Sequence, residues 1–128
     1  MNKTICFTGI VLGGTAVILG AFGAHGLEKL VDSNAIQTFE TGVKYQMYHA
    51  LLLLVLGSMK QLPKASKKLI FYFVLVGICC FSFSIYLLAT NSLTAFDFKA
   101  IGLVTPLGGT LLIIGWSIFG HRVYKHFD

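Results

Sequence analysis

The sequence contains very little charge. Asp, Glu, Lys and Arg make up only 12% of its 128 residues, whereas a soluble domain usually carries about 25%. Hydrophobic residues make up 55% of the chain, and its mean hydropathy is +0.79. A water-soluble core of one domain of this size could not bury so much apolar surface, so we expect lipid as the main solvent.

Acidic residues are the scarcest charged type, with 5 against 10 Lys and Arg. None lies inside the long apolar runs, except Glu40 at the end of one. This absence argues against cation coupling through a buried acid. The chain also lacks an HExxH motif, a nucleotide-binding loop, a nucleophile motif and paired carboxylates, so we expect neither an enzyme nor a cofactor.

Cysteine and histidine are too few and too dispersed for a metal or redox centre. Cys6, Cys79 and Cys80 all lie inside apolar runs, and no CxxC motif is present. We expect free, buried thiols, since neighbouring cysteines rarely form a disulfide bond. His25 and His49 lack a third ligand, so we predict no metal site.

Four apolar runs lie between the charged residues, and a membrane-spanning helix needs about 20 mostly apolar residues. The sequence predicts an all-α membrane protein, a bundle of four transmembrane helices in a single domain over residues 1–128. The predicted spans cover residues 4–24, 40–59, 69–89 and 100–120.

The second run is short, with only 15 uncharged residues between Lys44 and Lys60. We predict that it gains length from an amphipathic helix that begins near Asn34, where Gln37 three residues later resembles a capping box. This helix is expected to continue through Gly42 into the second span. One of its faces carries Ile36, Phe39, Val43 and Met47.

The basic residues predict the topology. With four spans, both termini and the middle loop lie on one side, which carries seven basic residues: Lys3, Lys60, Lys64, Lys67, Lys68, Arg122 and Lys125. The other side carries Lys29, Lys44 and Lys99. The positive-inside rule then places both termini in the cytoplasm. Membrane topology thus explains the basic residues, and we expect no nucleic acid partner.

Small residues recur along the first span. Gly9 and Gly13 form a GxxxG pair, and Ala16, Gly20 and Ala24 continue the stripe. Small residues let two helix backbones approach closely in a membrane. We therefore predict that this face packs against another helix.

His49 is the strongest candidate for a functional residue, because ionisable groups inside a span are often functional. It shares a helical stripe with Gln46. A neutral histidine at this depth requires partners for both ring nitrogens. Two readings stay open: an interhelical hydrogen bond, with Tyr45, Tyr48, Ser82 or Ser84 as partner, and a proton relay or ligand site.

Further candidate positions lie near predicted helix ends or breaks. His25 follows the first span, between Gly23 and Gly26. Pro106 lies inside the predicted fourth span, where it should cause a kink or local unwinding, and Thr105 could cap the freed backbone group. Further along, Trp116, His121 and Tyr124 are expected to mark the far membrane interface.

Three motifs together resemble domain-of-unknown-function family 423, also called the transmembrane protein 256 family. They are GAFGAHGL at residues 20–27, YQMYHALLLL at 45–54 and TPLGGTLLIIGW at 105–116. The resemblance implies a small four-span protein of the cell membrane, mostly bacterial (the inner membrane there). It implies no activity, substrate or catalytic residue.

Two classes of function remain open from the sequence. The preferred one is a non-enzymatic structural or interaction helix bundle, with a homo-oligomer as one form. The alternative is a small-solute or proton transporter or channel that uses His49 and the Pro106 kink. The lipid bilayer is the expected partner in both cases, and the sequence identifies no small-molecule ligand.

Overall fold

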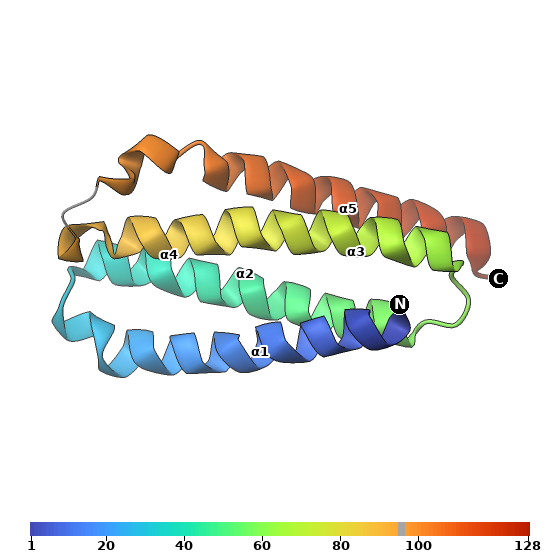
Figure 1. Cartoon of the computed structure of the whole chain (residues 1–128), viewed down its shortest axis with the longest axis horizontal. Helices are drawn as coiled ribbons and strands as arrows, with labels where there is room; N and C mark the ends of the chain where they lie inside the picture. The colour runs from blue at the N-terminus through green and yellow to red at the C-terminus, as the bar shows by residue number, and fades with distance from the viewer. Residues whose placement is uncertain (95–96) are drawn as a thin grey trace.

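The computed structural model describes residues 1–94 and 97–128, and every regular element in these residues is helical. Four antiparallel rods follow one another along the chain (Figure 1). The rods are α1 (Asn2–His25), α2 (Ser33–Ser58), the continuous run of α3 (Lys64–Ile78), η2 (Cys79–Phe83) and α4 (Ser84–Ala89), and α5 (Val104–His126). Short 3-10 turns lie in the connections: η1 (Leu27–Lys29), η3 (Asn91–Leu93) and η4 (Phe98–Ile101).

Three helical stretches are long and apolar enough to cross a membrane: Asn2–Lys29, Lys64–Ala89 and Val104–His126. They correspond to three of the four predicted spans. The second predicted span, within α2, does not reach the same apolarity, because Lys44, Gln46 and His49 lie along it.

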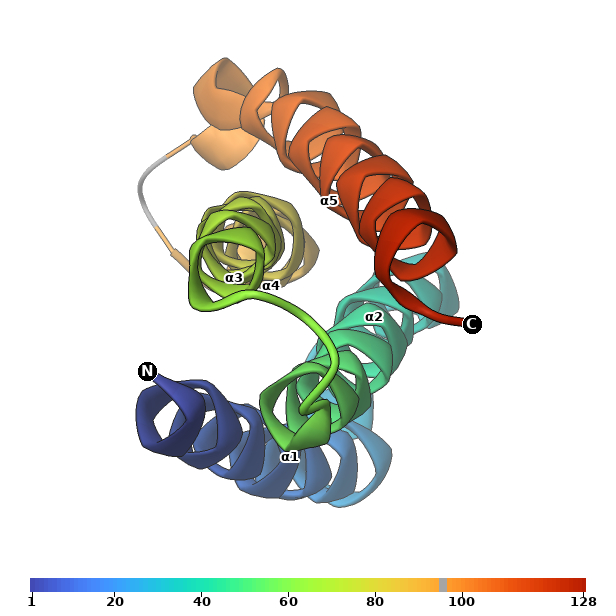
Figure 2. The same cartoon turned by 90° about the vertical axis from the view of Figure 1, so that its right-hand side faces the viewer.

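The rods pair as two hairpins (Figure 2). The first hairpin is α1 with α2, and the second is the α3–η2–α4 rod with α5. The α2 helix also packs against α3 and α4 and so joins the two hairpins. The main apolar cluster crosses this junction and includes Ile5, Leu53, Leu56, Ile70, Val74 and Leu112.

Within the first hairpin, small residues of α1 face α2. Among the glycines of α1, Gly9 makes the closest approach, since an added Cβ would lie 2.8 Å from the carbonyl oxygen of Ala50. Ala16 is fully buried, whereas Gly13 and Gly20 are half-buried. The prediction for Ala24 is wrong: Ala24 is exposed, and Gly23 packs on Phe39 in its place. The buried residues of α1 recur about every 3.5 residues, as in other packed helices. A stripe that advances by four residues each time therefore moves off the buried face by Ala24.

The α2 helix is continuous from Ser33 to Ser58, which confirms the predicted passage through Gly42. Its N-cap differs from the prediction. The side chain of Asp32 accepts a hydrogen bond of 2.8 Å from the backbone N–H of Ala35. Asn34 therefore lies within the first turn, and the predicted capping box is wrong.

The third rod begins at Lys64, directly after Pro63, five residues before the predicted start of the span. Its middle contains the π-helical segment η2, which the sequence analysis did not predict. Gly108 of α5 packs directly on this segment: an added Cβ would clash with the backbone nitrogen of Phe81 and lie 2.8 Å from the carbonyl oxygen of Gly77.

Neither the kink nor the local unwinding predicted at Pro106 occurs. The α5 helix begins at Val104, so Pro106 lies in its first turn, where backbone N–H groups have no partner within the helix. The missing N–H of proline therefore breaks no helical hydrogen bond. The span begins four residues later than predicted and continues to His126, which places Trp116 in the middle of α5 rather than at an end.

Candidate functional site

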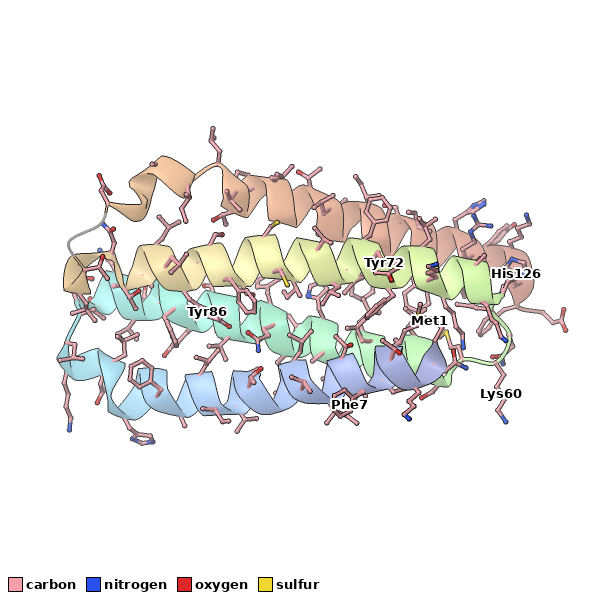
Figure 3. The ribbon with its side chains drawn as sticks, in the orientation of Figure 1. Met1, Phe7, Lys60, Tyr72, Tyr86 and His126 are labelled. Atoms are coloured by element: carbon pink, nitrogen blue, oxygen red, sulfur yellow. The ribbon has the colours of Figure 1, made fainter. Side chains whose placement is uncertain are left out.

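The candidate site is built on the buried face of α2, which carries the polar residues Gln46 and His49. Of the two, Gln46 forms more hydrogen bonds. Its amide nitrogen donates to the carbonyl oxygen of Leu12 and to the hydroxyl of Thr15, each at 2.8 Å. Its amide oxygen accepts a 2.7 Å hydrogen bond from the hydroxyl of Tyr86, which projects from α4 toward α2 (Figure 3). One buried amide therefore links α1, α2 and α4.

His49 lies one helical turn further along the same stripe and is buried. Its Nε2 lies 3.1 Å from the indole Nε1 of Trp116, and its Nδ1 lies 2.6 Å from the carbonyl oxygen of Tyr45. An indole nitrogen can only donate, so Nε2 is the acceptor and Nδ1 carries the proton. Both ring nitrogens of a neutral imidazole are thus paired.

The serines proposed as partners of His49 bond elsewhere. Ser82 of η2 donates to the carbonyl oxygen of Gly42 at 2.7 Å. The Ser84 hydroxyl lies 2.6 Å from the hydroxyl of Thr105. Thr105 therefore ties α5 to α4, rather than capping a backbone group freed by Pro106.

A cavity of about 310 Å³ opens beside His49, between α2 and α5. We call it the α2–α5 groove. Its walls are Tyr45, His49, Phe81, Gly109, Leu112, Ile113 and Trp116. None of these residues is charged. The rings of Tyr45 and Phe81, with centroids 5.0 Å apart, lie side by side in the wall.

His25 does not join this site. It is exposed at the end of α1, whereas His49 is buried between α2 and α5. In the described residues no group of three or more His, Cys, Asp or Glu side chains could hold a metal ion. The three cysteines are free, as predicted, but they are half-buried rather than buried.

Sequence reasoning missed Tyr86 and Trp116, which reach Gln46 and His49 of α2 from the second hairpin. Both carry an N–H or O–H group in the middle of an apolar run. Such a group requires an acceptor when no water is near. That requirement was the available signal, but Trp116 was interpreted as an interface marker.

The outer surface shows what solvent these helices meet. Large apolar side chains are exposed around the bundle, and Phe7 points from α1 away from it (Figure 3). Others on this surface are Ile10, Ile18, Leu107 and Ile113. With three helices long enough to span a bilayer, these features define a helical membrane protein.

The sequence comparisons agree with this class. Residues 19–109 match the family described as "Protein of unknown function (DUF423)", and the chain belongs to this family. It is 36% identical over 123 residues to a UPF0382 membrane protein of Staphylococcus saprophyticus, covering 96% of this chain and 98% of the relative.

Two further relatives carry the same description. The chain is 38% identical to a UPF0382 membrane protein of Bacillus subtilis, over 97% of this chain and 98% of the relative. It is 35% identical to one of Haemophilus influenzae, over 85% and 84%. No solved structure matches the chain.

Proposed function

We propose that this chain is a non-enzymatic structural or interaction protein of the bacterial inner membrane, in which four helices span the bilayer. Three of these are the long apolar helices described above, and the remaining one is α2, the second along the chain. With 26 residues against 24 in α1, it is long enough to cross a bilayer, and it lies antiparallel along α1 over most of its length (Figure 1). Gln46 and His49 in its middle are buried against other helices, whereas Lys44, nearer its N-terminal end, is exposed.

Both termini and the loop after α2 lie at the same end of the bundle (Figure 1). Seven of the ten Lys and Arg residues belong to this end. The positive-inside rule therefore supports a cytoplasmic location for it. The proposed orientation has the turn after α1 and the turn after α4 outside the cytoplasm.

Cysteine labelling tests this orientation. Gln61 and Ser92 are both exposed and lie at opposite ends. A membrane-impermeant maleimide added to intact cells should label Ser92→Cys and leave Gln61→Cys at the level of the parent chain. Labelling of Gln61→Cys alone would show the opposite orientation, and labelling of both variants would contradict the proposed one.

The observation that carries the structural function is the complete pairing of His49. An imidazole that relays protons needs a nitrogen that can exchange its proton along a polar path. Here Nδ1 is bonded to a carbonyl of its own helix and Nε2 to an indole. The groove beside it has no charged wall residue. These contacts support a fixed link between helices.

The variant His49→Ala separates the structural function from the transporter alternative, which rests on the position of His49 in the groove wall. We expect an unfolding free energy lower by about 1 kcal/mol, the scale of polar contacts between membrane helices. His25→Ala, a change of the exposed histidine, should leave that free energy unchanged.

The same three proteins are reconstituted in liposomes that contain a pH-sensitive dye. We expect no proton flux above that of protein-free liposomes in the parent. A parent flux that disappears in His49→Ala, together with unchanged stability of that variant, would establish the transporter alternative instead.

A further inference from the structure

We propose that the α2–α5 groove binds the hydrocarbon chain of a membrane lipid. The first argument is depth. Trp116 lies twelve residues after the start of α5 and ten before its end, so the groove opens at the middle of the span. Lipid headgroups lie about 15 Å from the bilayer midplane. Only the chain of a lipid reaches the groove.

The second argument is the chemistry of the walls. No wall residue carries a charge, and two of the three hydrogen-bonding side chains in the wall, His49 and Trp116, are bonded to one another, which leaves the hydroxyl of Tyr45 as the third. A ligand with a polar ring would find only the Tyr45 hydroxyl as a partner, and burying its other polar groups here unpaired costs free energy. A hydrocarbon chain has no such cost.

The third argument is shape. The α5 wall from Gly109 to Trp116 is about 10 Å long at 1.5 Å per residue. It runs parallel to the helix axis, and the chains of bilayer lipids lie in the same direction. Gly109 keeps the groove open, because an added Cβ would sit 3.7 Å from the ring of Phe81, in ordinary contact. The volume of about 310 Å³ is at the small end for ligand pockets.

Trp116 reports on the groove directly. It is the single tryptophan of the chain, and its side chain is 50% exposed. Bromine atoms quench tryptophan fluorescence on contact. The parent protein in dodecyl maltoside micelles is titrated with phosphatidylcholine brominated in the middle of its chains. We expect saturable quenching that unbrominated phosphatidylcholine reverses.

Gly109→Leu fills the groove, and Gly120→Leu makes the same change on the same helix where nothing lies within 4 Å. We expect the apparent affinity to fall about tenfold or more in Gly109→Leu, a loss of roughly 1.4 kcal/mol. It should stay unchanged in Gly120→Leu. Quenching that does not saturate, or that falls equally in both variants, would overturn the proposal.

A second pair of variants covers the case in which Gly109→Leu does not fold. Ile113→Phe narrows the groove from an exposed wall position, and Ile114→Phe changes the neighbouring residue, which does not line it. Only Ile113→Phe should weaken binding. Brominated phosphatidylglycerol should bind like brominated phosphatidylcholine, and a strict dependence on headgroup would contradict a chain site.

Discussion

The interfaces inside the two hairpins differ from the interface between them. Inside each hairpin, glycine lets helix backbones touch: Gly9 approaches the carbonyl of Ala50, and Gly108 lies on the backbone of η2. A few hydrogen bonds, from Gln46 to α1 and between Ser84 and Thr105, add to this close packing. Between the hairpins, side chains reach across and form hydrogen bonds to α2. The donors are Ser82, Tyr86 and Trp116, and the acceptors are Gly42, Gln46 and His49.

The difference shows how a bundle can be held together in lipid, where apolar burial between helices provides little driving force. Close backbone packing and hydrogen bonding are the two remaining contributions. Packing suits neighbours in sequence, which a short turn already holds together. Hydrogen bonds specify how the second hairpin is placed on the first, because each donor must meet one acceptor.

The largest loss of stability is expected for a substitution at Gly108. Gly108→Ala would push a Cβ into the backbone of η2, so the hairpin must open, at a cost of about 3 kcal/mol in unfolding free energy. Gly109→Ala is the matched control on the next residue. Its Cβ makes ordinary contact with Phe81, so its stability should stay within about 0.5 kcal/mol of the parent or rise with helix propensity.

Chemical unfolding in mixed micelles, followed by circular dichroism, measures both variants. Equal losses at the two positions would show that the close approach of α5 to η2 does not limit the stability of the second hairpin.

In the first hairpin we expect a smaller loss of stability, again from a Cβ placed at a close approach of two helices. Gly9→Ala places a Cβ 2.8 Å from the carbonyl oxygen of Ala50, and we expect a loss of about 1–2 kcal/mol. Gly13→Ala places one 3.6 Å from the Cβ of Ala50, which is ordinary contact. Its unfolding free energy, from the same assay, should not fall. A larger loss at Gly13 would mean that the two helices pack in another register.

These pairs also show what sequence could predict. Four apolar runs and the continuous helix through Gly42 follow from composition and pattern, and the family follows from the resemblance of three motifs. The GxxxG pair correctly marks α1 as a packed helix, but it cannot separate Gly9 from Gly13. That distinction depends on which glycine faces a carbonyl oxygen and which faces a methyl group across the interface.

The failures share a cause, since each depends on the position of an element boundary or a distant partner. Pro106 would cause a kink only if the helix began near residue 100, as predicted, and in fact it begins at Val104. The π-helical η2 lies where Gly108 of α5 packs on its backbone and Ser82 bonds to Gly42 of α2, and the sequence analysis did not predict it. The partners of Gln46 and His49 come from residues 40 and 67 positions away.

The most direct test of the account measures the coupling between Gln46 and Tyr86, which join the hairpins through a 2.7 Å hydrogen bond. Unfolding free energies are obtained for the parent, Gln46→Leu, Tyr86→Phe and the double variant. We predict a coupling energy of about 0.6 kcal/mol or more in favour of the bond, the average for polar pairs in a membrane protein. Strict additivity, within about 0.3 kcal/mol of zero coupling, would contradict the claim that hydrogen bonds to α2 hold the two hairpins together.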